Sequence, residues 1–125
     1  MKAFLDTHAA VALAEGDVEI LGAAARNLIE RSALFVSPFV RLELSMLAEI
    51  KRLRVGPDRI LDELAQNLGV AQSDDPVAAV VNHALTLQWT RDPLDRLLVA
   101  TAALHRAPFI TRDEKIHQNF AGAVW

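Results

Sequence analysis

Hydrophobic residues along the chain form short continuous runs, separated by longer stretches in which they recur at helical spacing. The continuous runs are typical of buried strands, and they predict strands at Ala3–Leu5, Leu34–Val36, Val70–Ala71 and Phe109–Thr111, with an edge strand at Ala123–Trp125. The remaining pattern predicts helices at about 9–13, 17–31, 37–52, 57–68, 76–87, 94–105 and 114–119. Short apolar strands that alternate with helices form a parallel sheet covered on both faces. We therefore expect an α/β protein, an α/β/α sandwich around a central, mostly parallel sheet of four to five strands.

Composition narrows the class of protein. The chain has 125 residues, of which 52% are hydrophobic, and it has no cysteine. A chain of this size can form one compact domain over residues 1–125 without disulfides or a structural metal. The lack of cysteine excludes thiolate metal sites and cysteine nucleophiles. No apolar run reaches the roughly 20 residues of a membrane span, and Asp6 interrupts the amino-terminal apolar segment. We therefore expect a cytoplasmic protein with no membrane partner.

The charge of the chain argues against one mode of nucleic-acid binding. The formal net charge is −3, so the protein does not bind nucleic acid mainly through bulk positive charge. Net charge leaves local patches open, and ten of the thirteen basic residues are arginine. The guanidinium group is suited to a planar, bidentate grip on phosphate or carboxylate.

Carboxylates stand at the positions where a parallel sheet would bring them together. Asp6 follows the first predicted strand and Asp113 follows the strand at 109–111, so both belong to the same sheet edge. Ligand sites of open parallel sheets lie at this edge. Glu43 lies on the apolar stripe of its predicted helix, where an unpaired carboxylate is costly. Asp95 lies in the first turn of the helix at 94–105, where the helix dipole favours a negative charge.

Each aspartate also has a purely structural interpretation. Asp6, Asp92 and Asp113 all precede predicted helices and can cap them. Glu43 has no capping role, and capping alone does not explain why all these carboxylates converge. The four histidines are scattered singly and are interpreted as structural or surface residues, namely His8, His83, His105 and His117.

A cluster of carboxylates favours hard cations. Clustered carboxylates repel one another unless they share a proton or bind a cation. Oxygen ligands without cysteine or paired histidines suit Mg²⁺ or Mn²⁺. Such an ion polarises a phosphoryl oxygen and lowers the pKa of a bound water, so phosphodiester hydrolysis is the reaction class that fits.

The order of these acidic segments resembles a known family. The segments are Phe4-Leu5-Asp6-Thr7-His8, Ser37-Pro38-Phe39-Val40-Arg41-Leu42-Glu43, Arg91-Asp92-Pro93-Leu94-Asp95-Arg96-Leu97-Leu98-Val99-Ala100 and Ile110-Thr111-Arg112-Asp113. Together they resemble the four acidic motifs of PIN-domain ribonucleases, and most closely those of VapC-type toxins of bacterial toxin–antitoxin pairs. The resemblance covers essentially the whole chain. It implies a single PIN-like domain, Mg²⁺- or Mn²⁺-dependent endoribonuclease activity, a cognate antitoxin and a homodimer.

The resemblance also assigns roles to residues of this sequence. The catalytic, metal-binding positions correspond to Asp6, Glu43, Asp95 and Asp113. Asp92 is kept as a supporting or capping residue. Thr7 and Thr111 are candidates to orient a carboxylate or a metal-bound water, with a local helix cap as the alternative. Arg96 either steadies an acidic neighbour, contacts RNA or forms a plain salt bridge. Possible contacts to RNA phosphates are Arg41, Arg52, Arg54, Arg91 and Arg112.

The apolar stripes of the helices at 17–31 and 37–52 suggest a groove for an antitoxin helix, although they can equally serve to cover the sheet. A catalytically silent PIN-like module that binds RNA or protein is the main alternative function. An aspartyl-phosphate phosphotransferase with Asp6 as nucleophile is less consistent with the sequence, because those enzymes typically carry a second aspartate where this chain has His8.

Overall fold

The fold is built on one five-stranded parallel sheet. The computed structural model describes residues 1–125. Its strands are β1 (Lys2–Leu5), β2 (Ala33–Val36), β3 (Ala71–Gln72), β4 (Phe109–Ile110) and β5 (Ala123–Val124). They lie in the order β3-β2-β1-β4-β5, and every neighbouring pair is parallel. The predicted α/β/α architecture is confirmed.

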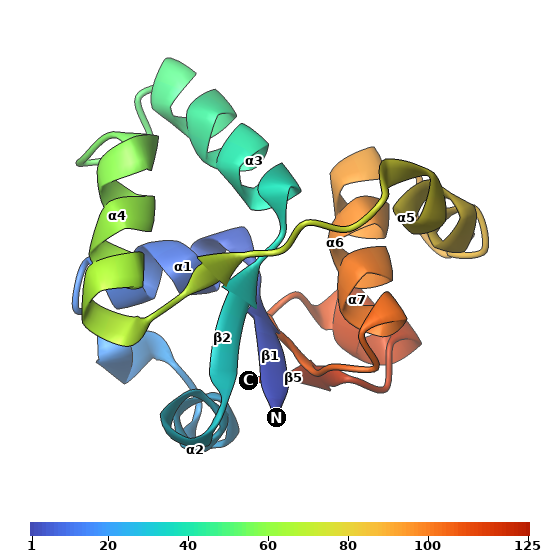
Figure 1. Ribbon diagram of the computed structural model, residues 1–125, viewed down its shortest axis with the longest axis horizontal. Coiled ribbons are helices and arrows are strands. Elements are labelled where there is room, and N and C mark those ends of the chain that lie inside the picture. Colours follow the sequence, from blue (N-terminus) through green and yellow to red (C-terminus); the bar gives the residue numbers. More distant parts are fainter.

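Helices cover both faces of the sheet. They are α1 (Thr7–Ala14), the short 3₁₀ helix η1 (Val18–Ile20), α2 (Ala23–Arg31), α3 (Pro38–Glu49), α4 (Pro57–Leu68), α5 (Val77–Ala84), α6 (Pro93–Leu104) and α7 (Glu114–Asn119). In Figure 1, α1 and α4 lie on one side of the sheet, and α5 and α6 lie on the other. The chain changes sides after β3, because β4 pairs with β1 on the edge opposite to β2. The carboxyl ends of β1 and β4 therefore form the switch point at which sheets of this class bind ligands.

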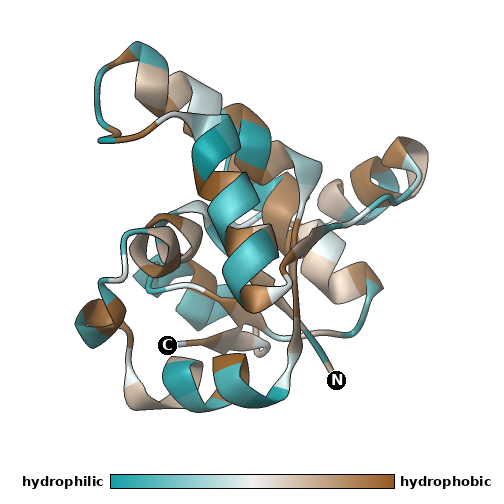
Figure 2. Ribbon diagram, turned by 60° about the vertical axis from the view of Figure 1, so that its left-hand side comes forward, coloured by the Kyte–Doolittle hydropathy of each residue, from teal (hydrophilic) through white to brown (hydrophobic).

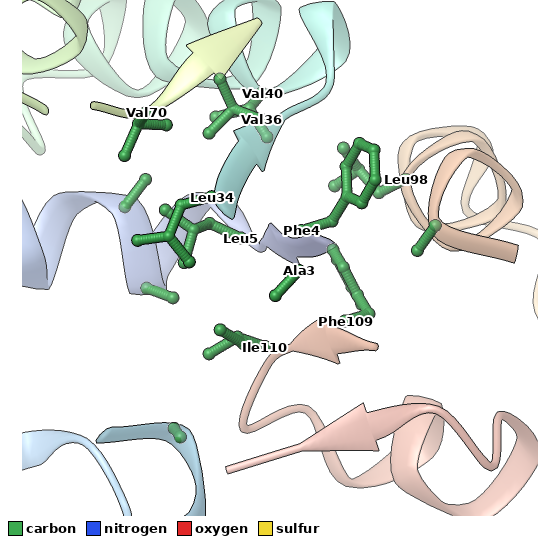
Figure 3. Packing of buried hydrophobic residues seen from close by; sticks show 14 of the residues in the cluster. Ala3, Phe4, Leu5, Leu34, Val36, Val40, Val70, Leu98, Phe109 and Ile110 are labelled. Atoms are coloured by element: carbon green, nitrogen blue, oxygen red, sulfur yellow. The ribbon is translucent and has the colours of Figure 1, made fainter. Parts of the chain in front are cut away.

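The core packs against both faces of β1. Phe4 and Leu5 are almost completely buried and point to opposite faces, as successive strand residues must. Figure 3 shows Phe4 on the side of Leu98 from α6, whereas Leu5 lies on the side of Leu34 and Ile110. Phe4 also stacks on Phe35, with 5.7 Å between ring centroids. The residues just after β1 and β4 are thus held on a rigid support.

The helix at 57–68 forms as predicted. Pro57 occupies its first turn, and Gly69 ends it in the left-handed conformation with a φ of 65°. Both residues suit those positions, because proline lacks the N–H that a first turn leaves unpaired and glycine has no Cβ to clash. The helix buries Ile60 and Leu64 and turns polar residues to solvent, as the hydropathy colouring in Figure 2 shows.

The prediction of one helix over residues 17–31 is wrong for the first half of that range. The structure has the 3₁₀ helix η1 at Val18–Ile20, extended residues at Leu21 and Gly22, and then α2 from Ala23. The break has a tertiary cause. A Cβ on Gly22 would lie 2.4 Å from the carbonyl carbon of Trp125, so the chain passes this point only as glycine in an extended conformation.

Two other predicted helices end early. The helix from Pro38 was expected to reach Arg52 but ends at Glu49, and Lys51 then adopts a φ of 58°, which helical continuation does not allow. The helix expected to run through Leu87 ends at Ala84. There the Thr86 hydroxyl donates a hydrogen bond to the carbonyl of His83 at 2.7 Å, which competes with the helical pattern. None of the helices has both the length and the apolar character needed to cross a bilayer.

Candidate active site

The predicted acidic residues converge on one cavity at the carboxyl ends of the strands. The cavity has a volume of about 480 Å³, and none of its lining residues is hydrophobic. Five of them are acidic and two are basic: Asp6, Glu43, Asp92, Asp95, Asp113, His8 and Arg112. They come from the ends of β1 and β4 and from the starts or middles of α1, α3, α6 and α7. Long-range folding alone brings these separate carboxylates together.

Asp6 is the most constrained of the carboxylates. It follows β1 and caps α1, since its Oδ1 accepts the Thr7 N–H at 2.7 Å. Its other oxygen accepts the hydroxyl of Thr111 at 2.6 Å. Burial raises the pKa of Asp6 above its usual value, and these two hydrogen bonds offset part of the rise. The two structural donors thus fix both carboxylate oxygens at the edge of the cavity.

Glu43 lies outside the core, and its side chain lines the cavity. It was expected on the buried stripe of its helix, and the structure places it half-buried in α3 beside the start of α1. The hydroxyl of Thr7 donates a hydrogen bond to Glu43 Oε1. Thr7 itself is fully buried, so it links the amino end of α1 to the middle of α3. This hydrogen bond lowers the energetic cost of a partly buried carboxylate on this helix face.

Asp92 and Asp95 line the cavity together from the start of α6. Asp92 caps this helix, because its Oδ1 accepts the N–H groups of Leu94 and Asp95 at 2.9 and 3.3 Å. The capping interpretation and the position at the cavity therefore both hold for Asp92. Burial raises the pKa of Asp95 to about 6, and the charges of Asp92, Asp113, Asp6 and Glu43 add to the rise. The carboxylates thus form one electrostatically coupled group.

Asp113 and Thr111 are joined at the end of β4. Asp113 caps α7, since its Oδ1 accepts the N–H of Ile116 at 3.0 Å. The Thr111 hydroxyl accepts the Asp113 N–H at 3.1 Å while it donates to Asp6. The backbone around this point continues the sheet, because the Asp6 N–H donates to the carbonyl of Ile110 at 2.9 Å. One buried hydroxyl therefore fixes the relative positions of two predicted metal ligands.

A comparison with protein families identifies the family of the chain. The family model of the PIN domain matches residues 3–121. The chain belongs to the PIN domain family. No curated protein sequence matches this PIN domain. The predicted resemblance to PIN domains is therefore confirmed over nearly the whole chain.

Two solved structures share the fold of this PIN domain at low sequence identity. The structure of VapBC2 from Rickettsia felis bound to a DNA fragment from its promoter contains a chain that is 15% identical, with a TM-score of 0.65 over 99% of this chain and 96% of that chain. A toxin–antitoxin complex from Klebsiella pneumoniae contains a chain that is 19% identical, with a TM-score of 0.64 over 98% of this chain and 96% of that chain. Both likenesses establish the fold.

The donor set of this PIN domain fits a hard divalent cation. The acidic residues of the cavity offer only carboxylate oxygens, which Mg²⁺ and Mn²⁺ prefer. The pKa of Asp95 is raised by burial and by repulsion from the neighbouring carboxylates, and a bound cation would relieve that repulsion. No three acidic or histidine side chains stand close enough together to form a ready-made cage for an ion. Asp6, Glu43, Asp95 and Asp113 are the residues that would hold it.

The predicted arginines occupy different environments. Arg112 lines the cavity. Arg41 forms an exposed ion pair with Asp58 at 3.0 Å, and Arg91 donates to the carbonyl of Gln88 at 3.0 Å. Arg52 and Arg54 lie in the exposed segment after α3 and do not line the cavity.

Arg96 holds the backbone that leads into α6. Its Nε donates to the carbonyl of Thr90 at 2.8 Å, and the Thr90 hydroxyl accepts the N–H of Asp92 at 3.2 Å. Arg96 has no ion pair within 4.0 Å. Its contact therefore supports the turn that carries Asp92 to the cavity.

Two histidines near the cavity were missed as site residues by sequence reasoning. His8 lines the cavity, and His117 contacts the backbone of Thr111. The available signal for His8 was its position two residues after Asp6, at the carboxyl end of a predicted strand. No sequence signal pointed to His117, because its contact depends on how α7 folds back on the end of β4.

Proposed function

We propose that this PIN domain is a nuclease that hydrolyses RNA phosphodiester bonds with Mg²⁺ or Mn²⁺, and that it is the toxin of a toxin–antitoxin pair. The observation that carries the proposal is the cavity in which five carboxylates from four parts of the chain converge without any hydrophobic lining residue. Membership of the PIN domain family supports nuclease chemistry. The fold shared with chains of toxin–antitoxin complexes supports an antitoxin partner.

The residues of the cavity have different roles in the proposed reaction. Asp6, Glu43, Asp95 and Asp113 bind the cation, which when bound polarises the scissile phosphate and lowers the pKa of a water molecule. Thr7 orients Glu43, and Thr111 orients Asp6 through their hydroxyl hydrogen bonds. Arg112 lies in the same cavity and is placed to bind a phosphate oxygen of RNA.

A silent binding module explains these observations less well. Burial and mutual repulsion raise the pKa values of Asp6 and Asp95, which means that their charged forms destabilise the fold. A module that only binds RNA or protein has no use for carboxylates that destabilise its fold. A metal-dependent enzyme does use them, because the repelling carboxylates are its ligands.

The test of the proposal is cleavage of RNA by the purified protein, free of any antitoxin. A labelled structured RNA is incubated with the protein in Mn²⁺, in Mg²⁺ and in EDTA. We expect cuts in one or both metals and none in EDTA. A folded protein that binds Mn²⁺ but cuts none of several RNAs would favour the silent module, and crosslinking to RNA in cells would then show whether RNA is its ligand.

An apolar groove away from the acidic cavity is the proposed antitoxin site. It has a volume of about 320 Å³ and is lined by hydrophobic residues of α1, η1, α2, α4 and the segment between η1 and α2, namely Leu13, Ala14, Val18, Leu21, Ile29, Leu64 and Leu68. The groove was expected between the helices at 17–31 and 37–52, but the second wall of this groove is α4, since Leu64 and Leu68 line it and no residue of α3 does. Its polar lining residues carry both signs of charge. Such a groove suits the apolar face of an amphipathic helix.

A charge in this groove is expected to release the antitoxin. Leu68 lines the groove and is 43% exposed, so Leu68→Glu leaves the core intact. Burying the new carboxylate under a partner helix costs about 2 kcal/mol or more, which is on the order of 30-fold in affinity. The measurement is co-purification of the variant with the product of a small neighbouring gene. Leu104→Glu, at a similarly exposed leucine outside the groove, is the control. Equal retention of both variants would contradict this site.

Two exposed stripes are the proposed homodimer interface. Along α3 and α5 and at the residue that follows each helix, hydrophobic residues recur every four positions with 40 to 64% exposure, namely Leu42, Met46, Ile50, Val77, Val81 and Leu85. Both helices pack against α6, and in Figure 1 α3 lies on one side of α6 and α5 on the other. Apolar surface of this extent on a small domain is typical of an interface.

A charge in the α5 stripe is expected to give monomers. Val81 stands between Val77 and Leu85 in the stripe, and Val81→Glu introduces a residue with higher helix propensity. We expect light scattering at micromolar concentration to report a dimer for the unmodified protein and a monomer for the variant. A dimer of unchanged mass in the variant would place the interface elsewhere.

A further inference from the structure

Thr111 connects two of the proposed metal ligands through one hydroxyl group. This hydroxyl donates to Asp6 Oδ2 at 2.6 Å and accepts the N–H of Asp113 at 3.1 Å. Thr111 is 1% exposed, so water does not compete for these hydrogen bonds. The direction of the hydroxyl depends on the orientation of the Thr111 backbone. The Thr111 N–H is held by the sheet, since it donates to the carbonyl of Val124 at 3.0 Å. Whatever holds the carbonyl of Thr111 therefore completes the support of the Asp6 carboxylate.

The carbonyl of Thr111 is held by a single side chain. The Nε2 atom of His117 lies 2.6 Å from this carbonyl oxygen. Thr111 lies outside the helices and strands, and no backbone N–H donates to its carbonyl. A buried carbonyl without a donor is costly. His117 is thus the only donor that the protein supplies to it.

The chemistry of this contact defines the state of the histidine ring. A carbonyl oxygen only accepts hydrogen bonds, so the Nε2 atom of His117 must carry the proton. Both the neutral Nε2–H tautomer and the imidazolium have this proton, and the contact therefore survives changes in the charge of the ring. The ring reaches back from α7, whose first turn is itself anchored by the bond from Ile116 N–H to Asp113. The end of β4 and the start of α7 are closed into one unit.

We propose that His117 is a positioning residue of the acidic cavity, whose Nε2–H holds the Thr111 carbonyl and thereby orients the Thr111 hydroxyl between Asp6 and Asp113. The inference rests on the proposed function, because the oriented carboxylates are the ones that would bind the cation. His117 does not line the cavity and acts through Thr111. Substitution of a residue that orients a metal ligand in this way typically lowers metal affinity or activity by about 10- to 100-fold.

Three variants separate this role from a structural one. His117→Ala removes the donor, and His117→Gln keeps an N–H donor at a similar reach. Gln118→Ala is the control, since Gln118 is the next residue on α7, is exposed and forms none of the hydrogen bonds of the cavity. For each protein, calorimetry gives the Kd for Mn²⁺, RNA cleavage gives kcat and KM from pH 6 to 8, and melting gives Tm. Long-range proton–nitrogen spectra of the unmodified protein without added metal give the tautomer of His117.

The proposal expects an Nε2–H tautomer and about a tenfold increase in the Kd for Mn²⁺ in His117→Ala, with a similar fall in kcat and little change in KM. The fall is the same at every pH, and His117→Gln restores most of it. Unchanged Mn²⁺ affinity and kcat in His117→Ala, an Nδ1–H tautomer, or a lower Tm as the only effect would each overturn it. A loss confined to one pH range would assign His117 to proton transfer instead. Failure of the proposed function is recognised separately, because the unmodified protein would then cut no RNA, whether or not it binds Mn²⁺.

Discussion

The Asp6→Asn protein is expected to fold normally and to lose metal-dependent RNA cleavage by about 100-fold or more. Asp6 is the carboxylate with both oxygens fixed by donors from the fold, at the centre of the sheet edge. Loss of one anionic ligand removes several kcal/mol of stabilisation of the developing charge, and each 1.4 kcal/mol corresponds to about tenfold in rate. The effect is measured as kcat/KM on a labelled RNA in saturating Mn²⁺.

The substitution leaves the surrounding hydrogen bonds possible. The asparagine oxygen can still accept the N–H of Thr7, and its NH₂ group can donate to the Thr111 hydroxyl once that hydroxyl turns. The change also removes a buried charge whose pKa is raised by burial, so Tm does not fall. Asp62→Asn, an exposed position on α4 outside the cavity, is the matched control for the loss of one charge. Wild-type cleavage by Asp6→Asn would refute the assignment of this cavity.

The Asp95→Asn protein is expected to be more stable than the unmodified protein when metal is removed. The pKa of Asp95 is raised from 3.8 to about 6 by burial and by the neighbouring carboxylates, so its charged form costs stability at neutral pH. The side chain is half-buried and solvent screens part of this cost, which leaves on the order of 1–2 kcal/mol. For a domain of this size we expect Tm to rise by about 4–8 °C at pH 7.5.

The pH dependence has a definite sign. A carboxylate whose pKa is higher in the folded state than in the unfolded state binds more protons when folded. Its cost is absent below pH 4, grows as the pH rises through the window from 3.8 to about 6, and is complete above it. The unmodified protein in EDTA should therefore gain stability relative to Asp95→Asn as the pH falls from 7.5 to 5.

Added metal is expected to reverse the order of the two Tm values, so that the unmodified protein melts at a higher temperature than Asp95→Asn. A ligand that binds only the folded state raises Tm, and it raises it more when it binds more tightly. Mn²⁺ should therefore stabilise the unmodified protein more than Asp95→Asn, while the variant loses RNA cleavage. Calorimetric melting at pH 5 and 7.5, with EDTA and with Mn²⁺, checks all of these outcomes. A lower Tm for Asp95→Asn in EDTA at pH 7.5 would mean that Asp95 stabilises the fold, and the interpretation as a repelled ligand would be wrong.

Local sequence signals predicted the elements whose ends are determined locally. The helix at 57–68 has proline at its start and glycine at its end, and α7 begins after the capping Asp113, as predicted. The strands were recognised from their continuous apolar runs because both faces of a parallel sheet are covered. The error at 17–31 has a different origin, since Gly22 breaks the helix to let the distant Trp125 approach. No pattern within residues 17–31 contains that contact.

In the candidate site, too, the sequence predicted some features and the tertiary structure decided others. Asp6 and Asp113 were predicted from their positions after strands, Glu43 and Asp95 from their positions on helices, and all four from the resemblance of their motifs to the family. The fold brings the four residues to one cavity. The sequence also indicated the kind of ion, because carboxylates without cysteine suit hard cations. It did not indicate which arginine lines the cavity, and Arg112 does so while Arg41 pairs with Asp58.

The sequence by itself thus determined the class of fold, the acidic residues and the chemistry that they can support. These properties follow from residue type and from spacing along the chain. Only the tertiary structure decided that Thr111 joins Asp6 to Asp113, that His117 holds Thr111, and that α4 forms a wall of the apolar groove. Those contacts depend on the side-chain directions of elements far apart in sequence, and hydrogen bonds of about 3 Å are set by packing in three dimensions.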